Sequence, residues 1–295
     1  MSGLRSFLFV PGDSERKLEK SEGVPADAVI IDLEDSVAPG NKAAARELAR
    51  DFLATYRGDR RHQLWVRINP LDHPEAGADL GAVMPHRPDG IMLPKTRSHE
   101  DVEVLGRRLG TYEAEYEIPV GSTRILPLVT ETPGSLFRLG DYGRVAKRLA
   151  GLTWGAEDLS AAVGAATARE ADGRWTSPYR MVRNLCLFAA HAAGVEAVDT
   201  LHANFRDHEG LAASCAEAQR DGFSGKLAIH PAQVDIINEA FTPSPEEVAR
   251  AREIVALFEA NPDAGTLALD GEMLDLPHLR QARRILAQSG AVGKD

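Results

Sequence analysis

The sequence predicts an α/β protein, a (β/α)8 TIM barrel followed by a C-terminal helical extension. Two observations carry this prediction: eight short apolar segments alternate with segments of helical periodicity, and most of the eight are continuous apolar runs. Continuous runs are typical of parallel strands that are buried on both faces, and eight strands alternating with helices favour a closed barrel. The glycine fingerprint G-x-G-x-x-G, which usually accompanies an open nucleotide-binding sheet, does not follow the first segment.

The eight expected strands are short and rich in β-branched or aromatic residues, and most of them end at a polar or turn-forming residue. They are expected at Ser6–Val10, Ala28–Leu33, Gln63–Ile68, Gly90–Leu93, Thr123–Val129, Gly151–Trp154, Ala197–Leu201 and Lys226–Ile229.

Four stretches have a clear helical pattern. Asn41–Tyr56 places apolar residues on one face, and Tyr179–Ala193 is apolar almost throughout, as in a helix pressed onto a sheet. Ser98–Leu109 begins with a serine and carries an aspartate three residues later, which resembles a capping box. Ser244–Ala260 begins with Ser-Pro-Glu-Glu, which combines a cap, a first-turn proline and acids at the positive end of the helix dipole.

The chain divides into two expected parts. Residues 1–240 form the barrel, and residues 241–295 contain the last barrel helix and a C-terminal extension that carries Asp275. Within the second part, Asn261–Gly271 has the composition of a linker, and a short helix is expected over Pro277–Ser289. Because this tail lies beyond the eighth strand, it must pack on the outside of the barrel or on a neighbouring subunit.

The charge and composition exclude several classes of protein. The 295 residues include 34 Lys or Arg and 44 Asp or Glu, which gives a formal net charge of −10. Such an acidic chain argues against a nucleic-acid binder, which needs a basic stripe. The chain has only two cysteines, so a disulfide scaffold is not expected, and it has no run long enough for a signal peptide or a membrane span. We therefore expect a cytoplasmic enzyme with no nucleic-acid or membrane partner.

Acidic side chains follow three of the expected strands, at the ends that form the active-site face of a barrel. Asp35, Glu131 and Asp158 would converge on one opening, where like charges repel each other. A Mg²⁺ ion bound by two carboxylates, waters and substrate oxygens would relieve this repulsion. Alternatively, Glu131 and Asp158 cap the helices that follow them. The residues alone leave both interpretations open.

Two basic residues occupy equivalent positions after other strands. Arg67 would be buried in the barrel mouth and would need an anionic partner, either a substrate carboxylate or Asp35. Lys95 is a candidate for substrate binding, although a structural salt bridge to one of the acids explains it equally well. His202 and His230 fit structural roles better than metal ligation, because nothing near them has zinc-like spacing.

Eight motifs occur in order along the chain, and together they resemble those of the citrate lyase β-subunit-like proteins. This family also holds malyl-CoA and citramalyl-CoA lyases and lies within the Mg²⁺-dependent HpcH/HpaI aldolase superfamily of (β/α)8 barrels. The resemblance extends from residue 5 to about residue 285. The motifs are Arg5–Gly12, Asp32–Val37, Arg67–Asn69, Leu93–Lys95, Glu131–Gly134, Gly155–Leu159, Gly222–Lys226 with Ile229–Pro231, and Met273–Pro277.

The resemblance implies a magnesium site and a substrate site. Glu131 and Asp158 would be the protein ligands of Mg²⁺, which would chelate a 2-oxo acid through its carboxylate and keto oxygens. The backbone amides of Gly155, Ala156 and Glu157 would bind the carboxylate of this acid.

The resemblance also implies catalytic roles. Arg67 would stabilise the enolate oxygen of the thioester partner. Glu34 and Asp35 would hold metal-bound waters and orient Arg67. The aspartate matching Asp275 would come from an adjacent subunit and act as general acid or base, which implies a homotrimer or a hexamer of trimers.

The function implied by this resemblance is reversible cleavage of a short β-hydroxyacyl-CoA, such as malyl-CoA or citramalyl-CoA, into a 2-oxo acid and acetyl-CoA. One alternative is a citrate lyase β subunit that cleaves a citryl group on an acyl-carrier protein to oxaloacetate and an acetyl carrier. A second alternative is a catalytically silent barrel that serves as a scaffold. The Asp275 segment favours the CoA lyase. Arg16, Lys17 and Lys20 are candidates for binding the CoA phosphates, or else form a solvated helix face.

Overall fold

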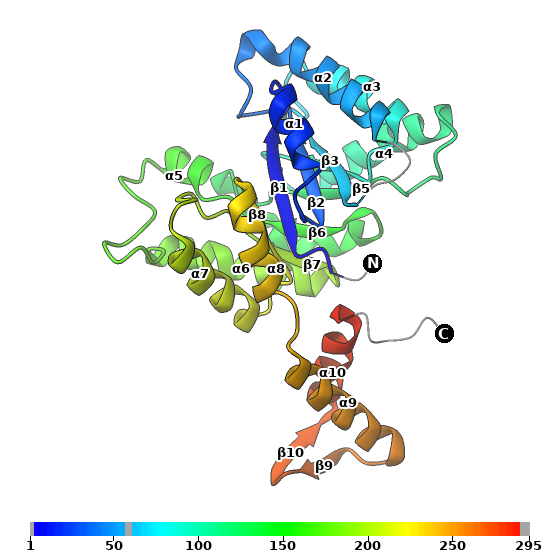
Figure 1. Cartoon of the computed structure of the whole chain (residues 1–295), viewed down its shortest axis with the longest axis vertical. Coiled ribbons are helices and arrows are strands. Elements are labelled where there is room, and N and C mark those ends of the chain that lie inside the picture. The colour runs from blue at the N-terminus through cyan, green and yellow to red at the C-terminus, as the bar shows by residue number, and fades with distance from the viewer. Residues whose placement is uncertain (1–2, 57–60, 290–295) are drawn as a thin grey trace.

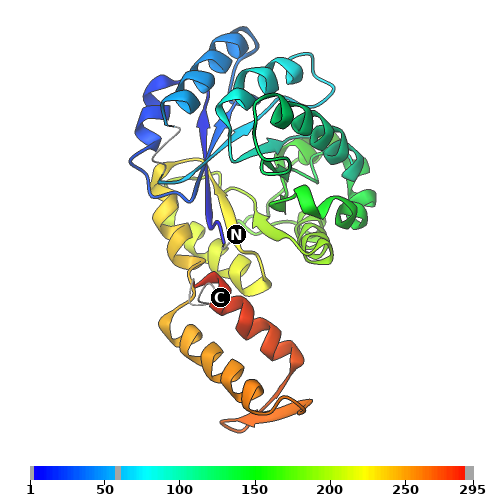
Figure 2. The ribbon, with the colours of Figure 1, turned by 90° about the vertical axis from the view of Figure 1, so that its right-hand side faces the viewer.

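The computed structural model describes residues 3–56 and 61–289 of the chain. Eight parallel strands form one sheet that curves into a nearly closed barrel surrounded by helices (Figures 1 and 2). The strand order in this sheet is β5-β4-β3-β2-β1-β8-β7-β6, which confirms the predicted (β/α)8 barrel. The strands are β1 (Ser6–Pro11), β2 (Ala28–Asp32), β3 (Gln63–Arg67), β4 (Gly90–Leu93), β5 (Arg124–Pro127), β6 (Gly151–Thr153), β7 (Glu196–Asp199) and β8 (Gly225–Ala228).

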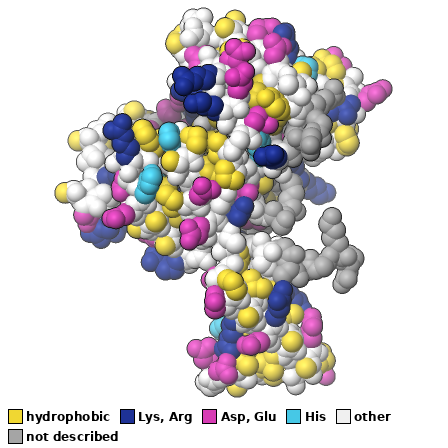
Figure 3. Space-filling view, viewed as in Figure 1, with side chains coloured by type: hydrophobic (Ala, Val, Ile, Leu, Met, Phe, Trp, Pro, Cys, Tyr) yellow, Lys and Arg dark blue, Asp and Glu magenta, His cyan; other side chains and the backbone are white. Residues whose placement is uncertain are grey.

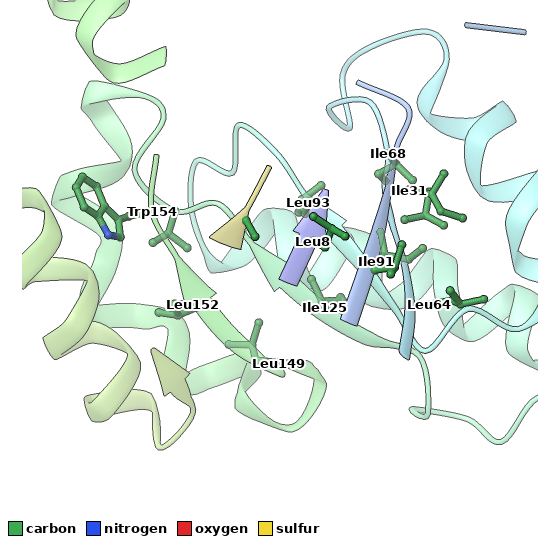
Figure 4. Packing of buried hydrophobic residues seen from close by; sticks show 14 of the residues in the cluster. Leu8, Ile31, Leu64, Ile68, Ile91, Leu93, Ile125, Leu149, Leu152 and Trp154 are labelled. Atoms are coloured by element: carbon green, nitrogen blue, oxygen red, sulfur yellow. The ribbon is translucent and has the colours of Figure 1, made fainter. Parts of the chain in front are cut away.

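The side chains of each strand alternate between two apolar regions. Ile31 of β2 packs in the outer region between the sheet and the helices, where Leu8 of β1 also lies (Figure 4). Ile30 packs in the barrel interior with Trp65. Because both regions exclude water, both faces of a strand are apolar, which explains the continuous runs in the sequence. A Cβ atom at position 90 would lie 2.2 Å from the Trp65 ring, so the barrel interior has room only for glycine there.

The helices around the barrel largely follow the expected pattern. The helix that starts after Ser98 continues to Glu115, six residues beyond the expected end, and the Asp101 side chain accepts a hydrogen bond from the Arg97 amide instead of closing a capping box on Ser98. The helices are α1 (Glu15–Ser21), α2 (Lys42–Thr55), α3 (Ala76–Val83), α4 (His99–Glu115), α5 (Glu157–Val163), α6 (Ser177–Ala193), α7 (His208–Asp221), α8 (Val234–Ala240), α9 (Pro245–Ala260) and α10 (Leu276–Gln288). Short 3-10 segments occupy Pro39–Asn41, Met84–His86 and Pro231–Gln233, and a longer one, η3 (Pro133–Arg148), connects β5 to β6.

The last barrel helix differs from the expectation. It is α8, which packs against β1, β8 and α7 and ends at Ala240, before the second part of the chain begins. The sequence analysis placed this helix after residue 240 because the start signal at Ser244 is strong. That signal instead begins α9, where the Ser244 and Glu247 side chains form a full capping box. We retain the division at residue 240 as a proposal.

The segment expected to be a linker forms most of a β-hairpin. Strands β9 (Thr266–Leu269) and β10 (Glu272–Asp275) pair in antiparallel fashion. They are joined by Asp270 and Gly271, whose φ angles of 52° and 82° are both positive. Asp-Gly favours such a turn, so this dipeptide was a usable signal for a hairpin. The turn composition of the segment was correctly noticed, but the short strands that flank the turn were missed.

The extension, residues 241–289, projects from one end of the barrel (Figures 1 and 2). Its helices α9 and α10 pack against each other and enclose two small apolar clusters of their own, around Ala282 and Phe258. On the face in Figure 3, acidic and basic side chains are interspersed over the barrel and the extension. Within the described ranges, no helix is long and apolar enough to cross a membrane.

Candidate active site

A cavity of about 360 Å³ opens at the carboxyl ends of the barrel strands. This is the end at which barrel enzymes carry their active sites. The cavity brings together six residues that the sequence analysis selected, although they come from four different strand ends. These six are Asp35, Arg67, Glu131, Gly155, Glu157 and Asp158.

Arg67, the last residue of β3, is held in a fixed orientation by Asp32, the last residue of β2. The guanidinium donates two hydrogen bonds to the Asp32 carboxylate, from Nε at 2.7 Å and from Nη2 at 2.6 Å. Its third nitrogen, Nη1, lies 3.1 Å from Glu34, and Phe9 packs against the guanidinium at 4.8 Å. Burial alone would lower the pKa of Arg67. The neighbouring acids outweigh burial and raise this pKa above its ordinary value. Arg67 is therefore a fixed cation at the cavity wall.

Asp32 was missed as the partner of Arg67. The protein partner expected from the sequence was Asp35, whose carboxylate lies 4.0 Å from Arg67 and is the more distant acid. Burial alone would raise the pKa of Asp32, but the two bonds from Arg67 hold this pKa below its ordinary value. The parallel register pairs Asp32 directly with Arg67, and this pairing was the signal that could have identified the partner.

Glu34, which is buried, and Lys95, which is half-buried, form an ion pair beside Arg67. The Lys95 ammonium bonds to the Glu34 carboxylate and lies 3.4 Å from Asp35 and 3.7 Å from Asp158. Lys95 adopts a left-handed backbone with φ of 50°, which is unusual for a residue other than glycine. Lys95 thus lies among three acids, Glu34, Asp35 and Asp158, as expected if it forms a structural salt bridge. Two of these acids, Asp35 and Asp158, line the cavity, so the Lys95 ammonium is also close to it.

Glu131 and Asp158 fit a divalent cation. Glu131 is 5% exposed, and burial, together with the charges of Asp158 and Glu34, raises its pKa to about 8 even though the Lys95 amide donates a hydrogen bond to it. A buried carboxylate in the field of other acids is a position where a bound cation gains free energy. Within residues 3–56 and 61–289, no group of three acid, histidine or cysteine side chains could hold a metal alone. Two carboxylates with waters and substrate oxygens remain the donor set that suits Mg²⁺.

The backbone amides at the start of α5 are partly occupied. The Gly155 amide donates to the Thr130 hydroxyl at 3.1 Å, and the Ala156 amide donates to the Glu157 side chain at 3.3 Å. A substrate carboxylate at Ala156 would therefore take the place of the Glu157 carboxylate. Binding of a carboxylate by these amides stays a prediction.

A buried charged network supports one wall of the cavity and was also missed. Trp154 lines the cavity, and its indole N–H donates to Asp199 at 2.8 Å. Lys226 donates to the other Asp199 oxygen at 2.6 Å, and Arg183 lies 3.5 Å from the same carboxylate. In the sequence, Lys226 is only the first residue of the eighth expected strand and has no predicted role. A lysine at the start of an apolar strand was the signal for this network, because its side chain is 1% exposed and bonds to Asp199.

The remaining candidates lie outside the cavity lining. Asp275 caps α10, where its carboxylate lies 2.6 Å from the His278 ring, and none of the described extension residues lines the mouth. Arg16, Lys17 and Lys20 are exposed on α1. His202 lies 3.3 Å from Asp207, and the His230 ring accepts a hydrogen bond from the Ala232 amide.

The fold and site define a barrel enzyme whose mouth combines acids suited to Mg²⁺ with a fixed arginine. The family model described as HpcH/HpaI aldolase/citrate lyase matches residues 5–231, and this chain belongs to that family.

Named relatives and a solved structure agree with this assignment. The (3S)-malyl-CoA thioesterase of Cereibacter sphaeroides (strain KD131) is 35% identical, covering 98% of this chain and 95% of the relative. The citrate lyase β subunit of Haemophilus influenzae is 33% identical, covering 97% of both chains. The mitochondrial citramalyl-CoA lyase of Rattus norvegicus is 29% identical, covering 98% of this chain and 86% of the relative. A crystal structure of CitE from Mycobacterium tuberculosis with magnesium, acetoacetate and coenzyme A superposes with a TM-score of 0.78 at 33% identity, covering 98% of both chains.

Proposed function

We propose that this chain is a Mg²⁺-dependent carbon–carbon lyase acting on a short β-hydroxyacyl-CoA such as malyl-CoA or citramalyl-CoA. The reaction yields, or consumes, a 2-oxo acid and acetyl-CoA. The observation that carries this proposal is that one cavity is lined by Arg67 and by the two carboxylates, Glu131 and Asp158, that fit a cation. Relatives that act on malyl-CoA and citramalyl-CoA, and a related structure that holds magnesium and coenzyme A, support it.

Cleavage breaks the bond between the hydroxyl-bearing carbon and the carbon next to the thioester. The hydroxyl gives its proton to water in the mouth, a carbonyl forms, and the bonding electrons pass to the thioester as an enolate, whose carbon then takes up one proton. When it is bound by Glu131 and Asp158, Mg²⁺ supplies the Lewis acid that makes the hydroxyl more acidic and stabilises the forming 2-oxo acid.

Arg67 would stabilise the enolate oxygen. Its guanidinium stays charged at any relevant pH and is held by Asp32 before substrate arrives, so no reorganisation is needed as charge develops. Glu34 and Asp35 would orient Arg67 and accept hydrogen bonds from water molecules bound to the metal. Lys95 would limit the electrostatic repulsion among the acids.

Asp275 would protonate the enolate carbon, or remove a proton from acetyl-CoA in the direction of condensation. Because no described residue of the extension lines the mouth of its own barrel, we infer that Asp275 serves the mouth of an adjacent subunit. This requires at least a dimer, and a homotrimer or a hexamer of trimers is our proposal. The cytoplasmic location stays a prediction.

A second candidate function is hydrolysis of the same thioester. The relative with 35% identity is named a malyl-CoA thioesterase, and such an enzyme would cleave the carbon–sulfur bond with water and release malate and free CoA. The citrate lyase β subunit is a third candidate, because a relative with 33% identity has that name.

Product analysis separates these candidates. Purified protein with Mg²⁺ is incubated with malyl-CoA or citramalyl-CoA, and acetyl-CoA, 2-oxo acid, free hydroxy acid and free CoA are quantified. A lyase gives acetyl-CoA and 2-oxo acid in equal amounts. Free CoA with malate would identify a thioesterase, and cleavage of a citryl-carrier protein alone would identify a citrate lyase β subunit. A silent scaffold would cleave none of these and would not bind oxaloacetate or glyoxylate in a Mg²⁺-dependent way.

A further inference from the structure

A second, larger cavity lies between the barrel and the extension. It encloses about 550 Å³ and shares no lining residue with the mouth. One side is the loop Asp221–Ser224, which precedes β8, and the other side is α10. Loops that precede barrel strands lie at the end opposite the active site, so this cavity is remote from the mouth of the same chain. Figure 2 shows the C-terminal end of α10 (red) beside the helices around β8.

Two arginines of α10 face this cavity without acidic partners among the described residues. Arg280 and Arg284 lie one turn apart on the same face of α10, and both line the cavity. In the part of the chain that the structure describes, neither makes an ion pair with a carboxylate, and Arg284 instead places Nη1 3.5 Å from Nδ1 of His191. By contrast, Arg250 of α9 pairs with both Asp270 and Glu272.

The two acids in the lining already have partners. Asp221 lies 2.7 Å from Arg183 and 3.0 Å from Arg220. The Glu247 carboxylate accepts a hydrogen bond from the Ser244 amide at 2.8 Å, within the capping box of α9. Neither acid forms an ion pair with Arg280 or Arg284 within the described residues, so these two guanidinium groups remain open to an anion in a chain whose net charge is −10. Guanidinium groups in this situation bind phosphate well, because their planar donors match phosphate oxygens.

The rest of the lining suits an aromatic ring. Phe223, Phe241, Pro243 and Ile285 contribute an apolar wall, and the amide side chains Gln219, Gln281 and Gln288 offer donors and acceptors beside it. The volume lies within the range of roughly 300–1,000 Å³ that is usual for small-molecule sites and is far larger than a single phosphate.

We propose that this cavity is a nucleotide-binding site, in which Arg280 and Arg284 bind the phosphates and the base lies against the apolar wall. A ligand there contacts the barrel and the extension together, so it would hold α10 against the loop before β8. Nothing in the proposed lyase chemistry uses these residues, and the inference does not depend on it.

The test is calorimetric titration of the full chain with ADP and with pyrophosphate, in EDTA. We expect ADP to bind and pyrophosphate to bind at least about tenfold more weakly, because it lacks the base. The variant R280Q/R284Q should weaken ADP binding by at least about tenfold, since each lost charge-assisted bond to a phosphate costs more than a neutral one.

A matched control variant removes two positive charges from other positions of the extension. The variant R252Q/R283Q changes two exposed arginines that do not line the cavity, and it should bind ADP like the wild type. Equal affinity for ADP and pyrophosphate would overturn the assignment to a nucleotide. Absence of ADP binding, or unchanged binding by R280Q/R284Q, would overturn the site itself. Loss of ADP binding in R16Q/K17Q/K20Q would place the ADP site near α1 and would also overturn its assignment to this cavity.

Discussion

The barrel mouth and the C-terminal extension hold their charged side chains in opposite ways. In the mouth, the Arg67 side chain is 13% exposed and contacts Asp32 and Glu34, so its position is set before any ligand binds. In the extension, the Asp275 side chain is 36% exposed and contacts His278 of α10. The mouth is thus a preorganised electrostatic site, whereas Asp275 is an exposed group outside the lining of this mouth. The proposed function makes the two regions halves of one site that is complete only after chains assemble.

The largest effect is expected from Asp275→Asn. Turnover should fall by about 10²–10⁴-fold, because a general acid or base is removed. Asparagine caps helices as well as aspartate, so α10 should keep its start. Steady-state assays with malyl-CoA or citramalyl-CoA give the loss, and calorimetry should find Mg²⁺ and oxo-acid binding unchanged. Full activity in this variant would remove Asp275 from the mechanism.

Arg67→Lys tests the barrel mouth, where the charged groups are held in place before substrate binds. A lysine cannot bond Asp32 through two nitrogens and also reach the enolate oxygen, so kcat should fall by about 10²–10³-fold. The matched control is Arg46→Lys: the Arg46 side chain is 14% exposed and pairs with buried Asp79, but it does not line the mouth. If both variants lose activity equally, the effect is one of folding and Arg67 has no special role.

Lys226→Met tests the support beneath the mouth. Burial alone would raise the pKa of Asp199, but Lys226 and Arg183 hold it below its ordinary value. Removal of Lys226 leaves the buried Asp199 carboxylate with the neutral Trp154 donor and the more distant Arg183 charge, and should lower the free energy of unfolding by about 3 kcal/mol. Chemical denaturation measures the loss, and the double variant Lys226→Met/Asp199→Asn should recover part of it. Wild-type stability in the single variant would show that the network does not support the wall.

The smallest of the expected effects is a loss of affinity for Mg²⁺. Glu131→Gln should weaken Mg²⁺ binding by more than about tenfold, since even groups behind the ligands are typically worth that much. Glu157→Gln changes another glutamate of the same lining and should leave Mg²⁺ affinity unchanged. Equal losses in the two variants would indicate a general charge effect of the mouth instead of ligation by Glu131.

The sequence predicted the barrel because most strands are apolar on both faces, and such runs are visible without knowledge of contacts. Arg67, Glu131 and Asp158 were found for a related reason: each lies at or just beyond the end of a strand. The bonds between Asp32 and Arg67 and between Asp199 and Lys226 were not predicted. They depend on register between strands, and hydrophobic periodicity reports which residues are buried without naming their partners.

The extension was harder to predict than the barrel. Its β-hairpin is short and mostly exposed, so the flanking strands carry little apolar signal, and only Asp270–Gly271 marks the turn. The cavity beside Arg280 and Arg284 depends on how α10 lies against the barrel, which no local pattern specifies.

We propose that the mouth of one chain and Asp275 of another form one active site. Co-expression of Arg67→Lys chains with Asp275→Asn chains tests it, because each variant alone should keep at most about a hundredth of wild-type turnover. In mixed oligomers, mouths with Arg67 meet extensions with Asp275 at random, so about a quarter of wild-type turnover per site should be recovered. If Asp275 served the mouth of its own chain, no mixed oligomer would contain a complete site. Absence of recovered activity in oligomers shown to contain both variants would contradict the account.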